Sequence, residues 1–228
     1  MATRLYFPET EPAPVTPPAP TADWDHVNAV SREALTAPDT SALTTTNYTP
    51  DASDHLVNGD ALHRQYVTAP LADQTVEGTV TAQLQCLEAH ANNNLFLTMK
   101  IYVISFDGVT TKEALLPITR ATSLEVATAL TNRTFPSTAL TLATLERGDR
   151  LCIEVGLAGT PAATSGVQGH NGSLRFGCSA AGGDLAVNET DTGTTVRPWI
   201  EFSANLAFDL PALGVVGASG AFAPLGGW

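Results

Sequence analysis

The chain has 228 residues, enough for one all-β domain with a closed core and short for two ordinary domains. Charged residues make up only 15%, and the formal net charge of -12 repels a phosphate backbone, which argues against nucleic-acid binding. No apolar run approaches the roughly 18 residues of a membrane helix, and the first 20 residues lack the pattern of a secretory signal. We therefore expect no nucleic-acid partner and no membrane span.

The first segment, residues 1–22, contains six prolines. Because proline lacks a backbone donor and fixes φ, this segment predicts an extended arm and not a helix or a central strand. The apolar run Leu5-Tyr6-Phe7 predicts that the arm packs, either on its own domain or on a neighbouring subunit.

Residues 23–59 are expected to form an irregular or partly helical lead-in, with a weak helical pattern over 23–35. A second weak helical pattern lies at 122–130. The β-branched residues in that segment leave its conformation open between helix and strand.

The middle segment, residues 60–208, is dominated by alternation of apolar and polar residues. The surest strand is 95–104, where Leu95, Leu97, Met99, Ile101 and Val103 share one face. The Asp107-Gly108 pair that follows predicts a turn and a return strand through 115–116. Further strands are expected at 62–67, 76–86, 138–145, 151–157, 173–178 and 199–208. This pattern predicts an antiparallel, jelly-roll-like β-sandwich.

The last segment, residues 209–228, is a Gly/Pro/Ala-rich apolar tail without charge from Pro211 onward. A tail with so few polar groups is poorly explained as a hydrated linker, and it has no helix or strand period. Burial against a partner explains both properties. The alternative is a solvent-exposed extension beyond the last strand.

Metal and thiol chemistry have weak support. No two of the five histidines have ligand spacing, and Cys86, Cys152 and Cys178 form no CxxC motif, so three buried free thiols are expected. The acidic Asp184 and the run 188–192 are candidates for calcium, although such turns are more often simply hydrated.

Catalytic motifs are also weak. The sequence contains no GxSxG motif. A carboxylate pair for glycoside hydrolysis would have to come from residues such as Glu154 and Glu201, which we expect on outward, hydrated strand faces. We therefore assign no catalytic, cofactor-binding or metal-binding residue and expect the protein not to be an enzyme.

Two recognition motifs have simpler explanations. The Arg147-Gly148-Asp149 tripeptide is good turn chemistry that leads into the strand at 151. The glycosylation sequons at Asn47, Asn132, Asn171 and Asn188 are expected by chance in a chain so rich in threonine.

The scattered Trp24, Trp199 and Trp228 are few for a sugar-stacking surface.

Several short motifs together resemble a group of uncharacterised structural proteins of tailed bacteriophages and prophages. They are MATRLYFP (1–8), RQYV (64–67), GDRL (148–151), IEVG (153–156) and RPWIEF (197–202). The resemblance runs from the N-terminus to about residue 208. It implies a virion component, tail-associated and jelly-roll-like, with no known active-site residues.

From these observations we expect a non-enzymatic structural component of a tailed-phage virion, a minor tail protein anchored to neighbouring subunits by its termini. Its expected partners are other virion structural proteins and symmetric copies of itself. One alternative is a capsid decoration protein. Another is a carbohydrate-binding module that attaches the particle to a host-surface glycan, because loops at the end of a sandwich are natural recognition sites.

Overall fold

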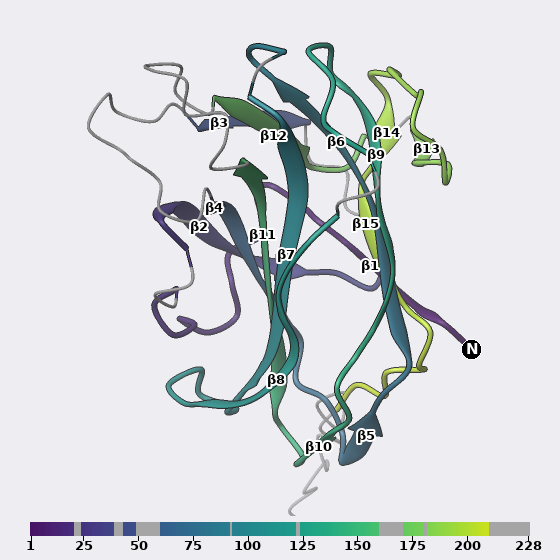
Figure 1. Cartoon of the computed structure of the whole chain (residues 1–228). Coiled ribbons are helices and arrows are strands. Elements are labelled where there is room, and N and C mark those ends of the chain that lie inside the picture. The colour runs from purple at the N-terminus through teal and green to yellow at the C-terminus, as the bar shows by residue number, and fades with distance from the viewer. Residues whose placement is uncertain are drawn as a thin grey trace, which may run out of the picture.

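The computed structural model describes residues 1–20, 24–38, 43–48, 60–91, 93–121, 124–159, 171–179 and 182–209. Within these ranges the fold is all-β, with two main sheets and two small ones (Figure 1). The first sheet has the order β1-β15-β6-β12-β3, with β9 also paired to β6, and the second has the order β2-β4-β11-β7-β8.

The first sheet contains β1 (Thr3–Tyr6), β3 (Thr44–Tyr48), β6 (Thr79–Glu88), β9 (Thr131–Ala139), β12 (Gly172–Phe176) and β15 (Trp199–Phe202). The second contains β2 (His26–Ala34), β4 (Asp60–Thr68), β7 (Leu95–Ile104), β8 (Thr111–Arg120) and β11 (Arg150–Gly159). The small pairs are β5 (Gln74–Val76) with β10 (Ala143–Leu145), and β13 (Gly183–Asp184) with β14 (Val196–Arg197).

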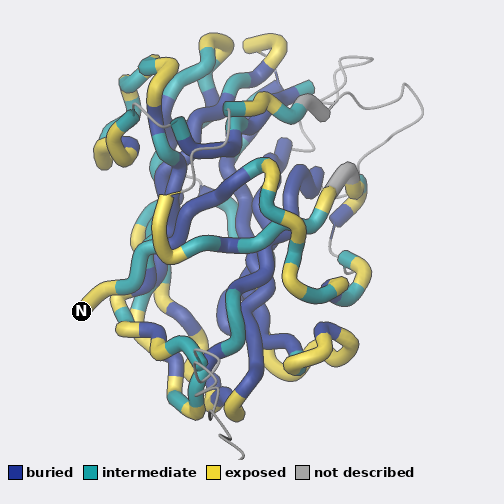
Figure 2. Tube along the Cα trace, turned by 180° about the vertical axis from the view of Figure 1, so that it is seen from behind, coloured by how far each residue is buried: buried dark blue, intermediate teal, exposed yellow. Residues whose placement is uncertain are grey.

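The two main sheets enclose one apolar core, seen as the dark blue interior of Figure 2. The chain passes from one main sheet to the other between β1 and β2, β2 and β3, β3 and β4, β4 and β6, β6 and β7, β8 and β9, β9 and β11, and β11 and β12. Such crossings between two layers are typical of jelly-roll topologies. The predicted all-β sandwich is therefore confirmed, except that β2 pairs with β4, and β13 with β14, in parallel.

Alternation along the strands correctly predicted which side chains enter the core. In β7, Leu97, Met99 and Ile101 all belong to the core cluster, as Ile153 and Val155 do in β11. Alternate side chains of a strand enter the core because successive residues point to opposite faces of a sheet.

The predicted turn at Asp107-Gly108 joins β7 to β8. Gly108 has a φ of 81°. Asp107 Oδ1 accepts hydrogen bonds from Ser105 Oγ at 2.6 Å and from the Val109 amide at 3.1 Å. The left-handed glycine and the short aspartate side chain close the predicted hairpin.

The lead-in differs from the irregular or helical segment expected at 23–59. Its described parts form β2 and β3, which lie at the open edges of the second and first sheets. The weak helical pattern over 23–35 was wrong because the edge of β4 supplies backbone partners to β2, from His26 to Ala34. Strand preference depends strongly on such tertiary context.

The second helical candidate, 122–130, contains no helix in its described part, 124–130. Val126 is buried in the core, and its amide donates to the carbonyl of Leu95 at 2.8 Å. This segment therefore runs beside the start of β7. A β-branched residue such as valine has a low helix propensity, so little conformational free energy is lost when it packs against a sheet in a non-helical conformation.

Two predicted strands have different bounds. The segment 138–145 is broken between β9 and β10, where the Leu140 amide donates to Gly78 and the Thr141 amide to Leu115. Most of β9 was not predicted. Pro136 lies within it, and proline is unusual inside a strand because it lacks a backbone donor. The last strand, expected over 199–208, ends at Phe202. Single backbone hydrogen bonds follow at Ser203 and Ala204, and the next β-bridge is Leu71–Phe208.

The N-terminal arm, residues 1–20, packs on its own domain. Its β1 pairs with β15, and Leu5 and Phe7 are fully buried. The following prolines cross to the second sheet, where Pro12 bridges to Arg32. The folded unit thus begins at Thr3, not near residue 60, because strands from the arm and the lead-in complete both sheets.

Candidate functional site

The outer face of the second sheet carries a buried polar cluster around Glu154. This carboxylate is fully buried although β11 points it away from the core. Its Oε2 accepts a hydrogen bond from Trp24 Nε1 at 2.7 Å, and its Oε1 accepts one from the Tyr102 hydroxyl at 2.8 Å. Gln65 Nε2 lies 3.1 Å from the same Oε1. Three neutral donors thus replace water around one carboxylate.

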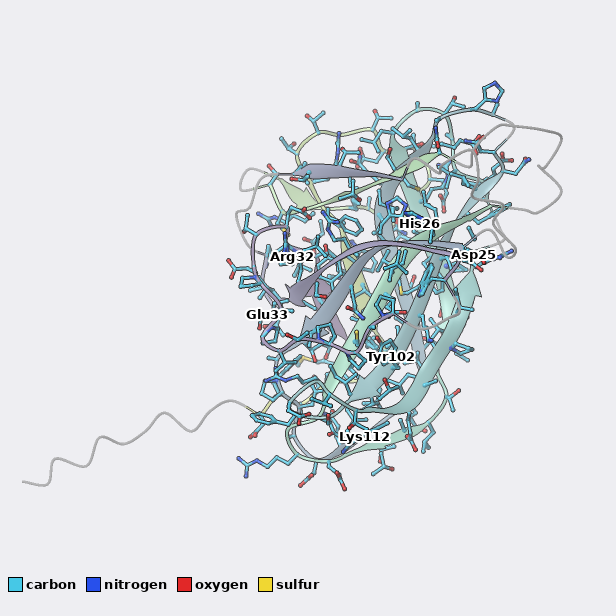
Figure 3. The ribbon with its side chains drawn as sticks, turned by 90° about the vertical axis from the view of Figure 1, so that its left-hand side faces the viewer. Asp25, His26, Arg32, Glu33, Tyr102 and Lys112 are labelled. Carbon is cyan, nitrogen blue, oxygen red and sulfur yellow. The ribbon has the colours of Figure 1, made fainter. Side chains whose placement is uncertain are left out.

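The N-terminal arm covers this cluster. Gln65 Nε2 also lies 3.1 Å from the carbonyl oxygen of Pro18, and Ala13 and Val15 pack on the apolar neighbours of Tyr102. Figure 3 shows Tyr102 on the sheet behind the N-terminal segment that crosses it. Burial raises the pKa of the Tyr102 phenol, which keeps the phenol protonated as a hydrogen-bond donor.

Further contacts hold Pro8 and Glu9 of the arm at the opposite, core-facing side of β4, toward which Arg64 and Tyr66 point. The Arg64 guanidinium pairs with Glu9, and both side chains are almost buried. The Tyr66 hydroxyl lies 3.3 Å from the carbonyl oxygen of Pro8, while Arg32 donates to the carbonyl of Glu9. Beyond β1 the arm is thus fixed by these side-chain contacts and by backbone hydrogen bonds to the carbonyls of Phe7 and Glu11.

Glu201, the second candidate carboxylate, lies on the outer face of the first sheet. It accepts two hydrogen bonds from Arg4, at 3.0 and 2.8 Å, and about a third of its side chain, 31%, is exposed. The two sheets and the core between them separate Glu201 from Glu154. These two carboxylates therefore do not converge on one cleft, as glycoside hydrolysis would require.

The acidic loop considered for calcium uses its oxygens internally. Asn188 Oδ1 accepts from the amides of Thr190 and Asp191, both at 3.1 Å, and Asp191 Oδ1 accepts from Gly193 at 2.7 Å. Asp184 accepts from Arg4 and Tyr6. Within the described ranges, no three His, Cys, Asp or Glu residues are grouped to hold a metal ion.

Among the described histidines, His63 is the one that is buried and has a lowered pKa. It is buried on β4, with Nδ1 3.4 Å from Thr46 Oγ1. Burial lowers its pKa from the usual 6.5 to about 3, so the ring is neutral at pH 7. His55 and His170 lie outside the described residues.

The cysteines are free and buried, as predicted for Cys86, Cys152 and Cys178. Burial raises the pKa of Cys86 to about 12 and also raises that of Cys152. These two thiols therefore remain protonated at neutral pH and are poor nucleophiles.

The Arg147-Gly148-Asp149 motif forms the predicted turn. Gly148 has a φ of 94°, and the Asp149 amide donates to Glu146 at 3.0 Å before β11 begins. The motif therefore has a structural explanation. Trp24 and Trp199 are buried, so neither presents its ring as a sugar-stacking surface.

One end of the sandwich gathers exposed apolar side chains beside the last described residue, Asp209. Phe106, Val109 and Leu142 are 60%, 75% and 58% exposed. The turn that carries Phe106 contacts the 146–149 turn, where Arg147 forms two hydrogen bonds with Asp209, at 2.9 and 3.0 Å. Leu142 precedes β10, at the lower end of Figure 1. We call this surface the tail-bearing end.

A pocket of about 390 Å³ lies near this region. It is lined by Glu33, Ala34, Leu35, Thr36, Ala69 and Phe208. No local sequence pattern indicated this pocket, because its walls come from the end of β2, the segment after β4 and the segment after β15. Figure 3 shows Glu33 beside Arg32 on β2.

Comparison with known proteins gives weak structural likenesses. No family model matches the chain, and no curated protein matches it. A CocE/NonD family hydrolase from Staphylococcus aureus matches with 10% identity and a TM-score of 0.47, over 91% of this chain and 36% of that chain. An alpha-amino acid ester hydrolase matches with 11% identity and a TM-score of 0.44, over 87% and 35%.

A viral structure is also similar. Infectious bursal disease virus, Gx strain, matches with 12% identity and a TM-score of 0.28, over 72% of this chain and 34% of that chain. The chain thus spans about a third of the length of these proteins. Within the described ranges, no helix is long and apolar enough to cross a membrane.

The hydrolase matches correct one expectation. We expected the protein not to be an enzyme, and the hydrolase structures, matched with a probability of 1.00, contradict that exclusion. The reason is that missing sequence motifs cannot exclude an activity whose residues come together only in the fold. At this identity and TM-score the matches assign no reaction to this chain.

Proposed function

We propose that the protein is a structural subunit of a virus particle that binds neighbouring subunits through its tail-bearing end. The observation that carries this proposal is the position of three exposed apolar side chains, Phe106, Val109 and Leu142, around the point where the uncharged C-terminal segment begins. Exposed apolar side chains at one end of a domain suit a surface that another protein covers.

The packing of the N-terminal arm bears on which terminus anchors the subunit. One or both termini were expected to anchor the subunit, and Leu5 and Phe7 of the N-terminal arm are buried in their own domain. The anchoring role therefore passes to the C-terminal segment, 210–228, which contains no charged residue. An apolar contact also suits a chain with a net charge of -12, because charged faces of identical copies would repel one another.

The resemblance of the sequence motifs to tailed-phage proteins supports a place in the tail, as a minor tail protein present in symmetric copies. The alternative place is the capsid surface, as a decoration protein. In both places the subunit contributes a rigid sandwich and one apolar contact surface.

The proposal is tested by incorporation into particles. The protein is co-expressed with the structural proteins encoded beside its gene, and particles are purified on a density gradient. We expect the full chain to sediment with particles and a chain ending at Asp209 to remain unassembled. Recovery of the shortened chain in particles at the level of the full chain would overturn the proposal.

A matched set of surface variants separates the apolar contact from general effects. Phe106→Ser, Val109→Ser and Leu142→Ser together are expected to lower incorporation about tenfold, which corresponds to about 1.4 kcal/mol of contact free energy. The control replaces the exposed Val27, Val30 and Val187, which lie elsewhere, with serine. Equal losses in both sets would contradict a specific role for the tail-bearing end.

A further inference from the structure

The pocket beside Phe208 is mostly apolar and lies between three separate segments. Ala34, Leu35 and Thr36 come from the end of β2 and the residues after it, and Ala69 follows β4. Glu33 is the charged residue among those that line it. Its volume of about 390 Å³ is within the range of sites that hold small apolar groups.

At Phe208 and Asp209 the chain runs toward this pocket. Phe208 forms an antiparallel bridge with Leu71, and the Asp209 amide donates to the carbonyl of Pro70 at 2.8 Å. In an antiparallel pair, each step forward along one strand is a step backward along the other. From Phe208 to Asp209 the chain therefore runs in the direction of Ala69, which is a wall of the pocket.

The exit of the chain is fixed at this point. Arg147 forms two hydrogen bonds with the Asp209 carboxylate, and Gln74 Nε2 donates to the carbonyl of Ala207 at 2.7 Å. A segment tethered at such a fixed point has an effective concentration of about millimolar or higher at a neighbouring site. Modest burial of apolar surface is then enough to keep the site occupied.

The composition of the following segment matches the lining. It starts Leu210-Pro211-Ala212-Leu213, and no charged residue occurs up to Trp228. An anionic ligand would instead meet Glu33 and a protein of net charge -12.

We propose that the pocket is a docking site for the first residues of this chain's own C-terminal segment, starting at Leu210. Docking in the same chain fills the pocket and sets the direction in which the rest of the segment leaves the sandwich. This inference concerns the isolated protein and does not depend on assembly into a particle, so each proposal can fail without the other.

Disulfide trapping in the full chain tests the proposal. Thr36 is exposed and lines the pocket, and the native cysteines are buried, so Thr36→Cys combined with Ala212→Cys supplies the two accessible thiols. A disulfide requires Cα atoms within roughly 7 Å. Under mild oxidation we expect an intramolecular bond, seen as a faster-migrating monomer and identified by peptide mass spectrometry.

Two controls make the result specific. Thr190→Cys combined with Ala212→Cys places the partner thiol on an exposed loop over the first sheet, and we expect no bond there. Ala69→Trp, added to the trapping pair, fills the pocket and is expected to lower the yield at least several-fold. Circular dichroism confirms that each variant is folded.

The outcomes are distinct. An intramolecular Thr36→Cys/Ala212→Cys bond that Ala69→Trp suppresses supports docking within one chain. A covalent dimer as the main product would overturn the proposal by showing that a second copy supplies the segment. Absence of any bond, or a yield equal to that of the Thr190→Cys control, would overturn it as well.

Discussion

At the scale of single residues, Glu154 is the side chain whose hydrogen-bond partners matter most for the stability of the fold. Its carboxylate has no exposed surface and accepts hydrogen bonds from Trp24 and Tyr102. A buried charge of this kind is tolerated only while its donors stay in place. Removing either the charge or a donor leaves a polar group that water cannot reach.

We expect Glu154→Gln to lower the free energy of unfolding by about 1–3 kcal/mol, because the amide nitrogen must face at least one existing donor. Urea titration followed by circular dichroism measures the loss. The matched control is Glu201→Gln, which removes an ion-pair partner of Arg4 that is about one-third exposed, and it is expected to cost less than about 1 kcal/mol. Equal losses for the two variants would contradict the description of the Glu154 cluster.

His63 gives a pH-dependent prediction. Its pKa is 6.5 in an ordinary setting and about 3 in the folded protein, so between these values the unfolded chain binds a proton that the folded chain does not. The contribution to stability is therefore complete above pH 6.5 and is lost as the pH falls toward 3. The slope approaches about 1.4 kcal/mol per pH unit where unfolded histidine is fully protonated.

We expect His63→Gln to flatten this dependence, measured as unfolding free energy between pH 7.5 and 5. The control is His90→Gln, since His90 is exposed. Parallel curves for the native protein and His63→Gln would show that His63 does not bring about the acid sensitivity.

At the scale of elements, the arm is part of the core. Phe7 is fully buried, with ring centroids 4.6 Å from Tyr66 and 6.3 Å from Phe176. Phe7 thus packs between the two sheets, and Val15, later in the arm, packs on the outer face of the second sheet. An arm that served only to bind a neighbour would leave the stability of the isolated domain unchanged when shortened.

We expect Phe7→Ala to lower the free energy of unfolding by about 3–5 kcal/mol, the usual cost of removing a buried ring. Val109→Ala, at an exposed turn, serves as the control and is expected to change stability by less than about 0.5 kcal/mol. Chemical denaturation of the isolated protein measures both. A Phe7→Ala loss below 1 kcal/mol would show that the arm does not contribute to the core.

At the scale of the whole molecule, the two sheets are joined through one core and through the arm that contacts both. Trp24 reports on the outer face of the second sheet, and Trp199 reports on the first. Because the arm and the long strands of both sheets contribute side chains to that shared core, the domain is expected to unfold in one cooperative step.

Two single-tryptophan proteins test this expectation. One carries Trp199→Phe and Trp228→Phe, and the other carries Trp24→Phe and Trp228→Phe. In each, we expect the fluorescence midpoint in urea to coincide with that protein's own circular dichroism midpoint. Separated midpoints in either protein would reveal sheets that unfold independently.

The sequence by itself determined the class of fold and the faces of the main strands. The alternation in β7 and β11 predicted their core residues because strand geometry is local and side chains alternate with a period of two. The same rule correctly predicted that Glu154 points away from the core. The turns at Gly108 and Gly148 were also predictable, because their residue types meet a local need for positive φ.

Only the tertiary structure decided what covers each outward face. Glu154 is dry because an arm distant in the sequence lies over it, and residues 26–34 form a strand because the edge of β4 is open to them. The pocket beside Phe208 likewise joins three segments far apart in the chain. Burial and edge pairing depend on neighbours from elsewhere in the sequence, so a local pattern of residues cannot predict them.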